Sequence, residues 1–325
     1  MYVSQRTEMI VKLLQLPGIG TRIADKIASM MSEVGLYENL DLKNYVDKCI
    51  KQGVISLKKE LTEDDFKKAF DKASKIIEDS FEKGIKIISK YDNDFPTSLK
   101  TLVDASGKDI SPIILNYKGN VRILNEKKSV AVIGTRNPTP EGEEAGTYYS
   151  RYFAENGYNI VSGLALGCDS IAHKGALSVN GMTTAVLAHG LHTISPKKNE
   201  SIAKEILENG GVLLSEYFIG TPAYTTYFVE RDRLQAGLAQ ATIVVQCGMK
   251  SGTMHAARTT MNNNRILACV RYKEDSVRTN ENVAGNEYLI RMGAYPLRIA
   301  GELCYMIESG KVLEYKRVFP ELKFK

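Results

Sequence analysis

A short segment that follows an apolar run combines residue types that hold phosphate. The run Val130 to Ile133 leads into Gly134, Thr135 and Arg136, and a helical pattern comes next. Glycine allows a ligand to approach the backbone closely, and the guanidinium forms a forked pair of hydrogen bonds to phosphate oxygens. The dinucleotide pattern G-x-G-x-x-G does not follow this run, and G-x-x-x-x-G-K-[ST] is absent from the sequence. The segment predicts a phosphate site without either nucleotide motif.

Two further loops hold small and polar residues between an apolar run and a helical pattern. The first contains Ser162, Gly163 and Gly167, which leave room for a ligand, and Asp169, which we expect to cap the next helix. The second, residues 250–253, reads Lys-Ser-Gly-Thr, and its amides and hydroxyls suit an anion at a helix N-terminus. A hydroxyl N-cap is the alternative there. Several such loops, most with a basic residue, favour one shared anionic ligand over independent caps.

An aromatic residue and two arginines lie together farther along the chain. Phe228 precedes Arg231 and Arg233. If the arginines begin a helix, they can contact successive phosphates, and the ring can stack on a base. The alternative is a solvated basic turn with Phe228 in the core.

Near the N-terminus, the residues Gly18, Gly20, Thr21 and Arg22 lie between two amphipathic patterns and resemble a helix-hairpin-helix. Two glycines permit a sharp turn that directs amide groups toward a DNA phosphate. A turn used only for packing is the alternative.

The sequence offers little for catalysis or metal binding. His189 and His192 form an isolated H-x-x-H without acids or cysteines nearby, and no G-x-S-x-G pattern is present. We expect a structural role for His173. We therefore predict no catalytic residue, no metal and no cofactor.

Composition sets the class of protein. The 325 residues are 43% hydrophobic and 25% charged, with a net charge of +5, which fits a folded protein and allows a polyanionic partner. The N-terminus lacks the pattern of a signal peptide, no apolar stretch suits a membrane span, and the five cysteines form no C-x-x-C pair. We expect a cytoplasmic protein without membrane association.

Apolar periodicity divides the chain into three parts. Residues 1–85 have only helical periodicity, with a helix start at Thr62 and a stop at Gly84. Residues 86–305 alternate short β-branched runs with amphipathic segments, which predicts an α/β domain with a Rossmann-like, doubly wound and mainly parallel sheet. Residues 306–325 are expected to form a tail or a short packed arm. The predicted strands are 130–133, 159–161, 184–187, 211–214, 241–245 and 266–270, and the predicted helices are 141–156, 170–179, 198–209, 231–238 and 253–262.

Motifs in this order resemble the DNA-processing protein A (DprA/Smf) family between about Tyr91 and Pro296. The resemblance is carried by Tyr91-Asp92-Asn93-Asp94-Phe95-Pro96, Val132-Ile133-Gly134-Thr135-Arg136, Ser162-Gly163-x-Ala165, Asp169-x-x-Ala172-His173, Arg231-x-Arg233 and Ser251-Gly252-Thr253.

The resemblance implies a dimer that binds single-stranded DNA in natural transformation and passes it to the recombinase RecA. Some members of the family append a winged-helix domain, and we expect none within these 325 residues. Leu166 stands where the family usually has arginine, Asp232 replaces an asparagine, and Val229 replaces a proline. The expected DNA contacts are Gly134, Thr135, Arg136, Ser162, Gly163, Gly167, Lys174, Phe228, Arg231, Arg233, Lys250, Ser251, Gly252 and Thr253, with Gly18, Gly20, Thr21 and Arg22 in the hairpin.

A related group, resembling lysine-decarboxylase-like and cytokinin-activating enzymes, gives an alternative. Its G-G-x-G-T-x-x-E loop supplies a catalytic glutamate, and Ala256 occupies that position here. The alternative function is therefore a nucleotide sensor that has no catalytic activity. In a third interpretation, the hairpin domain binds duplex DNA and the larger domain serves only for assembly.

Overall fold

The computed structural model describes residues 3–34 and 42–315. The first part is helical: α1 is Gln5–Gln15, α2 is Thr21–Val34, α3 is Leu42–Lys51 and α4 is Glu63–Glu82. The predicted boundaries of the last helix are confirmed. Thr62 is its N-cap in a reciprocal capping box with Asp65, and Gly84 follows with φ +66.

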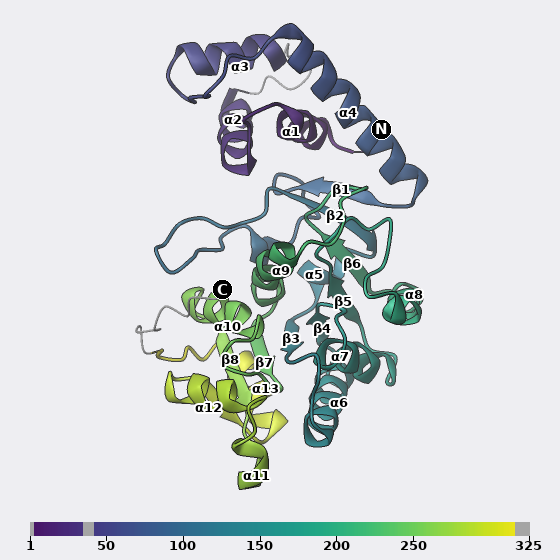
Figure 1. Ribbon diagram of the computed structural model, residues 1–325, viewed down its shortest axis with the longest axis vertical. Helices are drawn as coiled ribbons and strands as arrows, with labels where there is room; N and C mark the ends of the chain where they lie inside the picture. Colours follow the sequence, from purple (N-terminus) through teal and green to yellow (C-terminus); the bar gives the residue numbers. More distant parts are fainter. Residues whose placement is uncertain (1–2, 35–41, 316–325) are drawn as a thin grey trace.

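The rest of the described chain folds around one nine-stranded sheet with the order β1-β2-β6-β5-β4-β3-β7-β8-β9 (Figure 1). The pairs β1/β2 and β2/β6 are antiparallel and the other pairs are parallel. The strands are β1 Lys86–Ser89, β2 Ile114–Gly119, β3 Ser129–Ile133, β4 Asn159–Ser162, β5 Thr183–Val186, β6 Val212–Ser215, β7 Ala241–Val244, β8 Ile266–Val270 and β9 Tyr295–Leu297.

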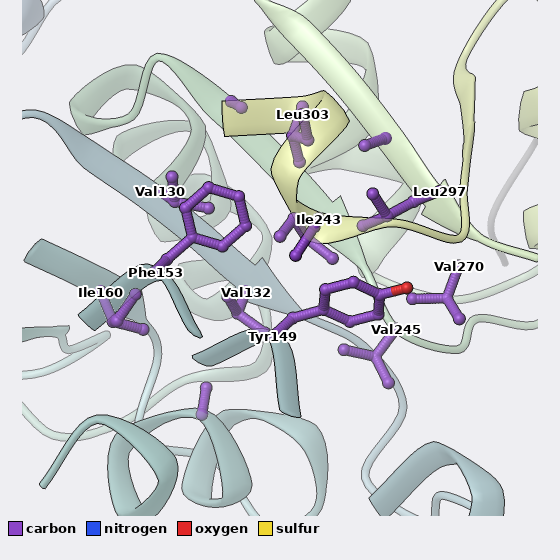
Figure 2. Close-up of a cluster of buried hydrophobic side chains, with 14 of the residues drawn as sticks. Val130, Val132, Tyr149, Phe153, Ile160, Ile243, Val245, Val270, Leu297 and Leu303 are labelled. Carbon is purple, nitrogen blue, oxygen red and sulfur yellow. The ribbon is translucent and has the colours of Figure 1, made fainter. Parts of the chain in front are cut away.

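Helices cover both faces of this sheet. They are α5 Ile123–Glu126, α6 Pro140–Glu155, α7 Cys168–Leu177, α8 Glu200–Glu208, α9 Thr225–Leu238, α10 Thr253–Asn262, α11 Asp275–Arg278, α12 Ala284–Arg291 and α13 Ala300–Glu308, with short 3₁₀ turns at Thr97–Leu99 and Lys197–Asn199. Alternate residues of β3 show the two layers. Val130 and Val132 pack with Tyr149 and Phe153 of α6 (Figure 2). Ala131 packs with residues of α9 on the other face.

The predicted fold class is confirmed, as are the strands and helices predicted between residues 130 and 270, within a few residues at their ends except at the start of α9. The strands β1, β2 and β9 were not predicted from the sequence. The helix predicted at 231–238 begins earlier, at Thr225.

The helical part packs directly on the sheet domain. The Lys90 ammonium lies 2.5 Å from Asp25 of α2, and the Tyr91 hydroxyl donates to the same carboxylate at 2.7 Å. One apolar cluster contains residues of α1, α2 and α4 together with Ile87 and Ile114 of the sheet. The expected boundary near residue 85 is therefore crossed by a common core.

The expected boundary at residue 305 lies inside α13. Beyond this helix, the Tyr315 hydroxyl accepts from the Leu267 amide at 2.8 Å and donates to the Arg265 carbonyl at 2.6 Å. This part of the C-terminal segment is a packed arm, and residues 316–325 lie outside the described residues. Within the part of the chain that is described, every helix is too short or too polar to span a lipid bilayer.

Candidate nucleic-acid interface

A cavity of about 840 Å3 opens where β3 and β7 lie side by side. The chain leaves β3 toward β4 and leaves β7 toward β8, on opposite sides, so their carboxyl ends form the topological switch point of the sheet. The loops that follow these strands and the first turns of α9 line the cavity. Residues of the loops for which we expected one shared ligand meet at this cavity.

Glycines bring the loop after β3 close to the start of α7. The Cys168 amide donates to the Thr135 carbonyl at 3.0 Å, and the Thr135 amide donates to the Gln246 carbonyl at 2.7 Å. A Cβ on Gly134 would lie 2.6 Å from the Cys168 sulfur, and a Cβ on Gly167, where φ is +73, would lie 2.4 Å from the Arg136 carbonyl. The protein's own backbone fills the space that we expected a ligand to take at Gly167.

Arg136 and Phe228 form the open part of the cavity. The Arg136 side chain is exposed, and its guanidinium carbon lies 5.4 Å from the centre of the half-buried Phe228 ring. Such a cation over a ring is a favourable pair that leaves the donors of the guanidinium available. A strand could contact Arg136 with a phosphate and Phe228 with a base.

Arg231 has a different position from the one expected. It is 4% exposed, and its guanidinium donates to the Val186 carbonyl at 2.5 Å. With the amide oxygen of Gln235 turned toward Arg231, this oxygen accepts from Arg231 Nε at 3.0 Å and from Arg231 Nη1 at 2.7 Å. A Cβ on Gly163 would lie 1.7 Å from Nη1, so Gly163 makes room for Arg231 rather than for a ligand. Arg231 forms a buried part of the cavity lining, which we call its floor.

Two carboxylates share this buried cation. The Asp232 Oδ1 atom lies 3.3 Å from Arg231 Nε. Burial raises the pKa of Asp232 to about 7, an effect that Arg231 opposes and Asp169 increases. Burial also raises the pKa of Asp169, against the charge of Arg231. Asp169 is not the helix cap that we expected: the N-cap of α7 is Gly167, and the Asp169 carboxylate accepts from the Ala165 amide at 3.3 Å.

Arg233 does not face this cavity. Residues two positions apart point to nearly opposite sides of a helix, and both arginines lie well inside α9 instead of opening it. The Arg233 guanidinium donates to both oxygens of Glu216 at 2.6 Å and to the Ile110 carbonyl at 2.9 Å. The expectation that Arg231 and Arg233 contact successive phosphates is therefore wrong for this geometry.

The loop after β7 contributes Lys250, Ser251, Gly252 and Thr253 to the cavity wall. The Ser251 hydroxyl accepts from the Thr253 amide at 3.2 Å, and the next two amides of α10 donate to the carbonyls of residues 251 and 252. The first amides of this helix are therefore used locally. Lys250 is exposed and supplies the charge of this loop.

The remaining predicted contacts lie elsewhere. The buried Ser162 hydroxyl donates to the Val132 carbonyl at 2.7 Å, and Lys174 is exposed on α7 away from the cavity lining. His173 is buried and its Nδ1 lies 2.7 Å from the Thr183 hydroxyl, and burial lowers its pKa to about 3. It stays neutral, as a structural histidine. The described residues contain no group of three or more side chains suited to a metal ion.

The predicted hairpin lies between α1 and α2. Gly18 has φ +78, while Gly20, Thr21 and Arg22 are exposed. A second groove of about 810 Å3 separates α2 from the sheet domain and is lined by Arg22 and Lys26, but also by Asp25 and Glu216. The charges of this groove are mixed, and its role in DNA binding stays a prediction.

Several residues of the cavity lining were not predicted. Gln235 was not predicted, and Asp232 was noted only as a departure from the family pattern. Both follow Phe228 at helical spacing and face the same side of α9, a signal that a correct helix start would have given. Glu281 and Asn282 also line the cavity, and nothing in the local sequence indicated this.

Fold and site together define a class: an α/β protein with a doubly wound sheet, a helical N-terminal region, and a cation and an aromatic ring in a cavity at the switch point. Residues 86–308 match the model of the DNA recombination-mediator protein A family, and the chain belongs to that family.

Curated relatives agree with this assignment. The chain is 36% identical over 199 residues to protein Smf of Escherichia coli, a match covering 61% of this chain and 52% of that protein. It is 31% identical over 189 residues to DNA processing protein DprA of Bacillus subtilis, covering 58% of this chain and 61% of that protein. These matches span between half and two thirds of the relatives.

Solved structures are similar as well. DNA processing protein A of Streptococcus pneumoniae has a TM-score of 0.72 at 26% identity, covering 94% of this chain and 98% of that one. DNA processing protein A of Helicobacter pylori, whose structure concerns its single-stranded DNA binding mode, has a TM-score of 0.59 at 29% identity, covering 69% of this chain and 96% of that one.

Proposed function

We propose that this protein binds single-stranded DNA in the cavity between the loops after β3 and β7 and mediates homologous recombination. The observation that carries the proposal is the exposed Arg136 guanidinium over the Phe228 ring at the switch point. Membership of the recombination-mediator family and the single-stranded DNA binding of the Helicobacter pylori relative support it.

The proposed mode of binding uses the strand backbone first. Arg136 and Lys250 are the exposed cations of the cavity wall and contact phosphates, while Phe228 stacks on a base. Backbone contacts and stacking accept any base, so strands of different sequence bind. Thr135 and Ser251 to Thr253 line the wall between these contacts, and Arg231 holds the floor in place. In the hairpin, Gly18 and Gly20 to Arg22 are a secondary contact.

The cellular role follows from the family resemblance. The protein coats incoming strands in the cytoplasm during natural transformation and loads RecA on them, and it acts as a homodimer. Light scattering of the purified chain should give twice the mass of one chain. RecA filament formation on strands already coated with the protein should be faster than on strands mixed with a variant that cannot bind DNA, and equal rates would contradict loading.

We propose no catalytic activity. Ala256 is buried at the cavity wall, in the place where the resembling hydrolases have a glutamate. Purified protein should neither cleave DNA nor hydrolyse nucleotides. Turnover that disappears in an Asp169 or Ser251 variant would overturn this reading.

Fluorescence anisotropy with single-stranded, duplex and mononucleotide ligands tests the proposal. Single strands should bind best, and a plot of log affinity against log salt should fall by about 0.7 per phosphate contacted. A preference for a free mononucleotide would favour the nucleotide sensor, and a preference for duplex would favour the hairpin. A salt slope near zero would exclude the phosphate site.

A further inference from the structure

Asp232 is unexpected in a cavity that holds phosphates. Phe228 and Asp232 are one helical turn apart on α9, so they lie on the same side of the helix and both line the cavity. A carboxylate at this place repels phosphate but accepts hydrogen bonds from neutral donors. The donors that a DNA strand offers are the N–H groups of its bases.

The carboxylate of Asp232 is available for such a donor. Its side chain is 15% exposed, and among the described residues its charged neighbour in ion-pair range is Arg231, whose Nε lies 3.3 Å from Oδ1. Oδ2 faces the loop after β7, 3.4 Å from the position of a Cβ on Gly252. Within residues 3–34 and 42–315, the side chain of Asp232 forms no hydrogen bond with another residue. The charged groups that surround it are Arg231, Asp169 and Arg136, with Lys250 and Glu281 on the cavity wall.

We propose that the cavity takes one base of the bound strand, stacked on Phe228, and that Asp232 selects guanine at this position. Guanine presents N1–H and the N2 amino group side by side, and a carboxylate accepts from both. Adenine and cytosine present one amino group beside an acceptor nitrogen, and thymine presents one N–H between two carbonyls. A carboxylate therefore pairs twice with guanine and once with the other bases.

This inference rests on the proposed function and adds a preference at one position to sequence-tolerant binding. Because the pKa of Asp232 is raised to about 7, the carboxylate is formed as the pH rises through 7. The preference for guanine should then increase with pH, while binding of a thymidine strand weakens as the negative charge appears. Opposite pH trends for two strands of equal length distinguish base selection from a general charge effect.

The experiment is an anisotropy titration with strands of equal length. The reference is oligodeoxythymidylate, and the others carry guanine, cytosine, adenine or hypoxanthine at every third position. The guanine strand should bind about fivefold or more tightly than the cytosine strand above pH 7. The hypoxanthine strand, which lacks the N2 amino group, should lose most of this advantage.

Matched variants assign the effect to Asp232. Asp232→Asn should reduce the guanine preference to about twofold or less and strengthen binding of the thymidine strand. Asp232→Glu keeps the charge but displaces the carboxylate. It should lose the preference for guanine, and its affinity for the thymidine strand should not increase. Glu205→Gln, on the exposed side of α8, makes the same charge change elsewhere and should keep the preference. Thermal unfolding checks that each variant is folded.

Two results would overturn the proposal. One is that the wild-type protein binds thymidine strands but binds the guanine and cytosine strands with equal affinity. This result would leave the proposed function standing. The other is a guanine preference that persists in Asp232→Asn. A protein that binds none of the strands would refute the proposed function itself.

Discussion

Replacing Arg136 by alanine should weaken single-strand binding more than replacing any other exposed cation of the sheet domain. The guanidinium is exposed at the cavity, lies over Phe228 at 5.4 Å, and forms no ion pair with a carboxylate of the described chain. Its donors are therefore available for phosphate. A charge-assisted hydrogen bond is worth about 1.5–3 kcal/mol, which corresponds to a loss of about one to two decades in affinity. Arg136→Lys should recover part of this loss, since lysine keeps the charge without the fork.

Anisotropy titrations of oligodeoxythymidylate over a salt series measure this effect. Arg136→Ala should also reduce the log-log salt slope by about 0.7, because one phosphate contact is lost. Lys174→Ala is the matched control: Lys174 is exposed on α7 but lies outside the cavity, so affinity and slope should stay close to wild type. The reasoning is refuted if Arg136→Ala folds and binds as wild type, and more so if Gly18→Val or Arg22→Ala abolishes binding.

Other predictions concern the floor of the cavity and the far side of α9. Affinity for oligodeoxythymidylate should fall by up to about tenfold between pH 6 and pH 8, because the pKa of Asp232 is raised to about 7 and its negative charge appears in this interval. A wild-type affinity that does not change with pH, or a pH dependence that persists in Asp232→Asn, would contradict this. Gly163→Ala should lower the free energy of unfolding, measured in urea, by roughly 1–3 kcal/mol, because its Cβ displaces the Arg231 guanidinium from the carbonyl that it binds. Arg233→Ala should lower the free energy of unfolding by roughly 3 kcal/mol, because it leaves Glu216 without its partner. The double variant with Glu216→Ala should recover part of this stability. An Arg233→Ala protein as stable as wild type would refute this prediction.

Much of the fold could be predicted because the strands β3 to β8 are buried on both faces. Such strands are continuous apolar runs, and the β-branched residues of β3, β7 and β8 make them conspicuous. The edge strands gave weaker signals. β1 begins with the exposed Lys86 and β9 has three residues, one of them a proline, and only pairing within the folded sheet defines them as strands.

The loops that line the candidate site could be predicted better than the positions of their side chains. Glycines at strand ends correctly marked the loops around the cavity, but Gly163 and Gly167 serve the close approach of Arg231 and of the Arg136 backbone. A sequence cannot separate a glycine that admits a ligand from one that admits another part of the same chain. The direction of the two arginines depended on where α9 begins, and the start at Thr225 places Arg233 against Glu216.

Photocrosslinking locates the strand most directly. A single strand that contains 5-iodouracil, which reacts with nearby aromatic rings, is bound, irradiated and mapped by peptide mass spectrometry. The account predicts that the main crosslink forms at Phe228 in the cavity and disappears in Phe228→Leu. Crosslinks confined to peptides of the helical region, or at aromatic residues far from the cavity such as Tyr305 on α13, would contradict the claim that the switch-point cavity holds the DNA.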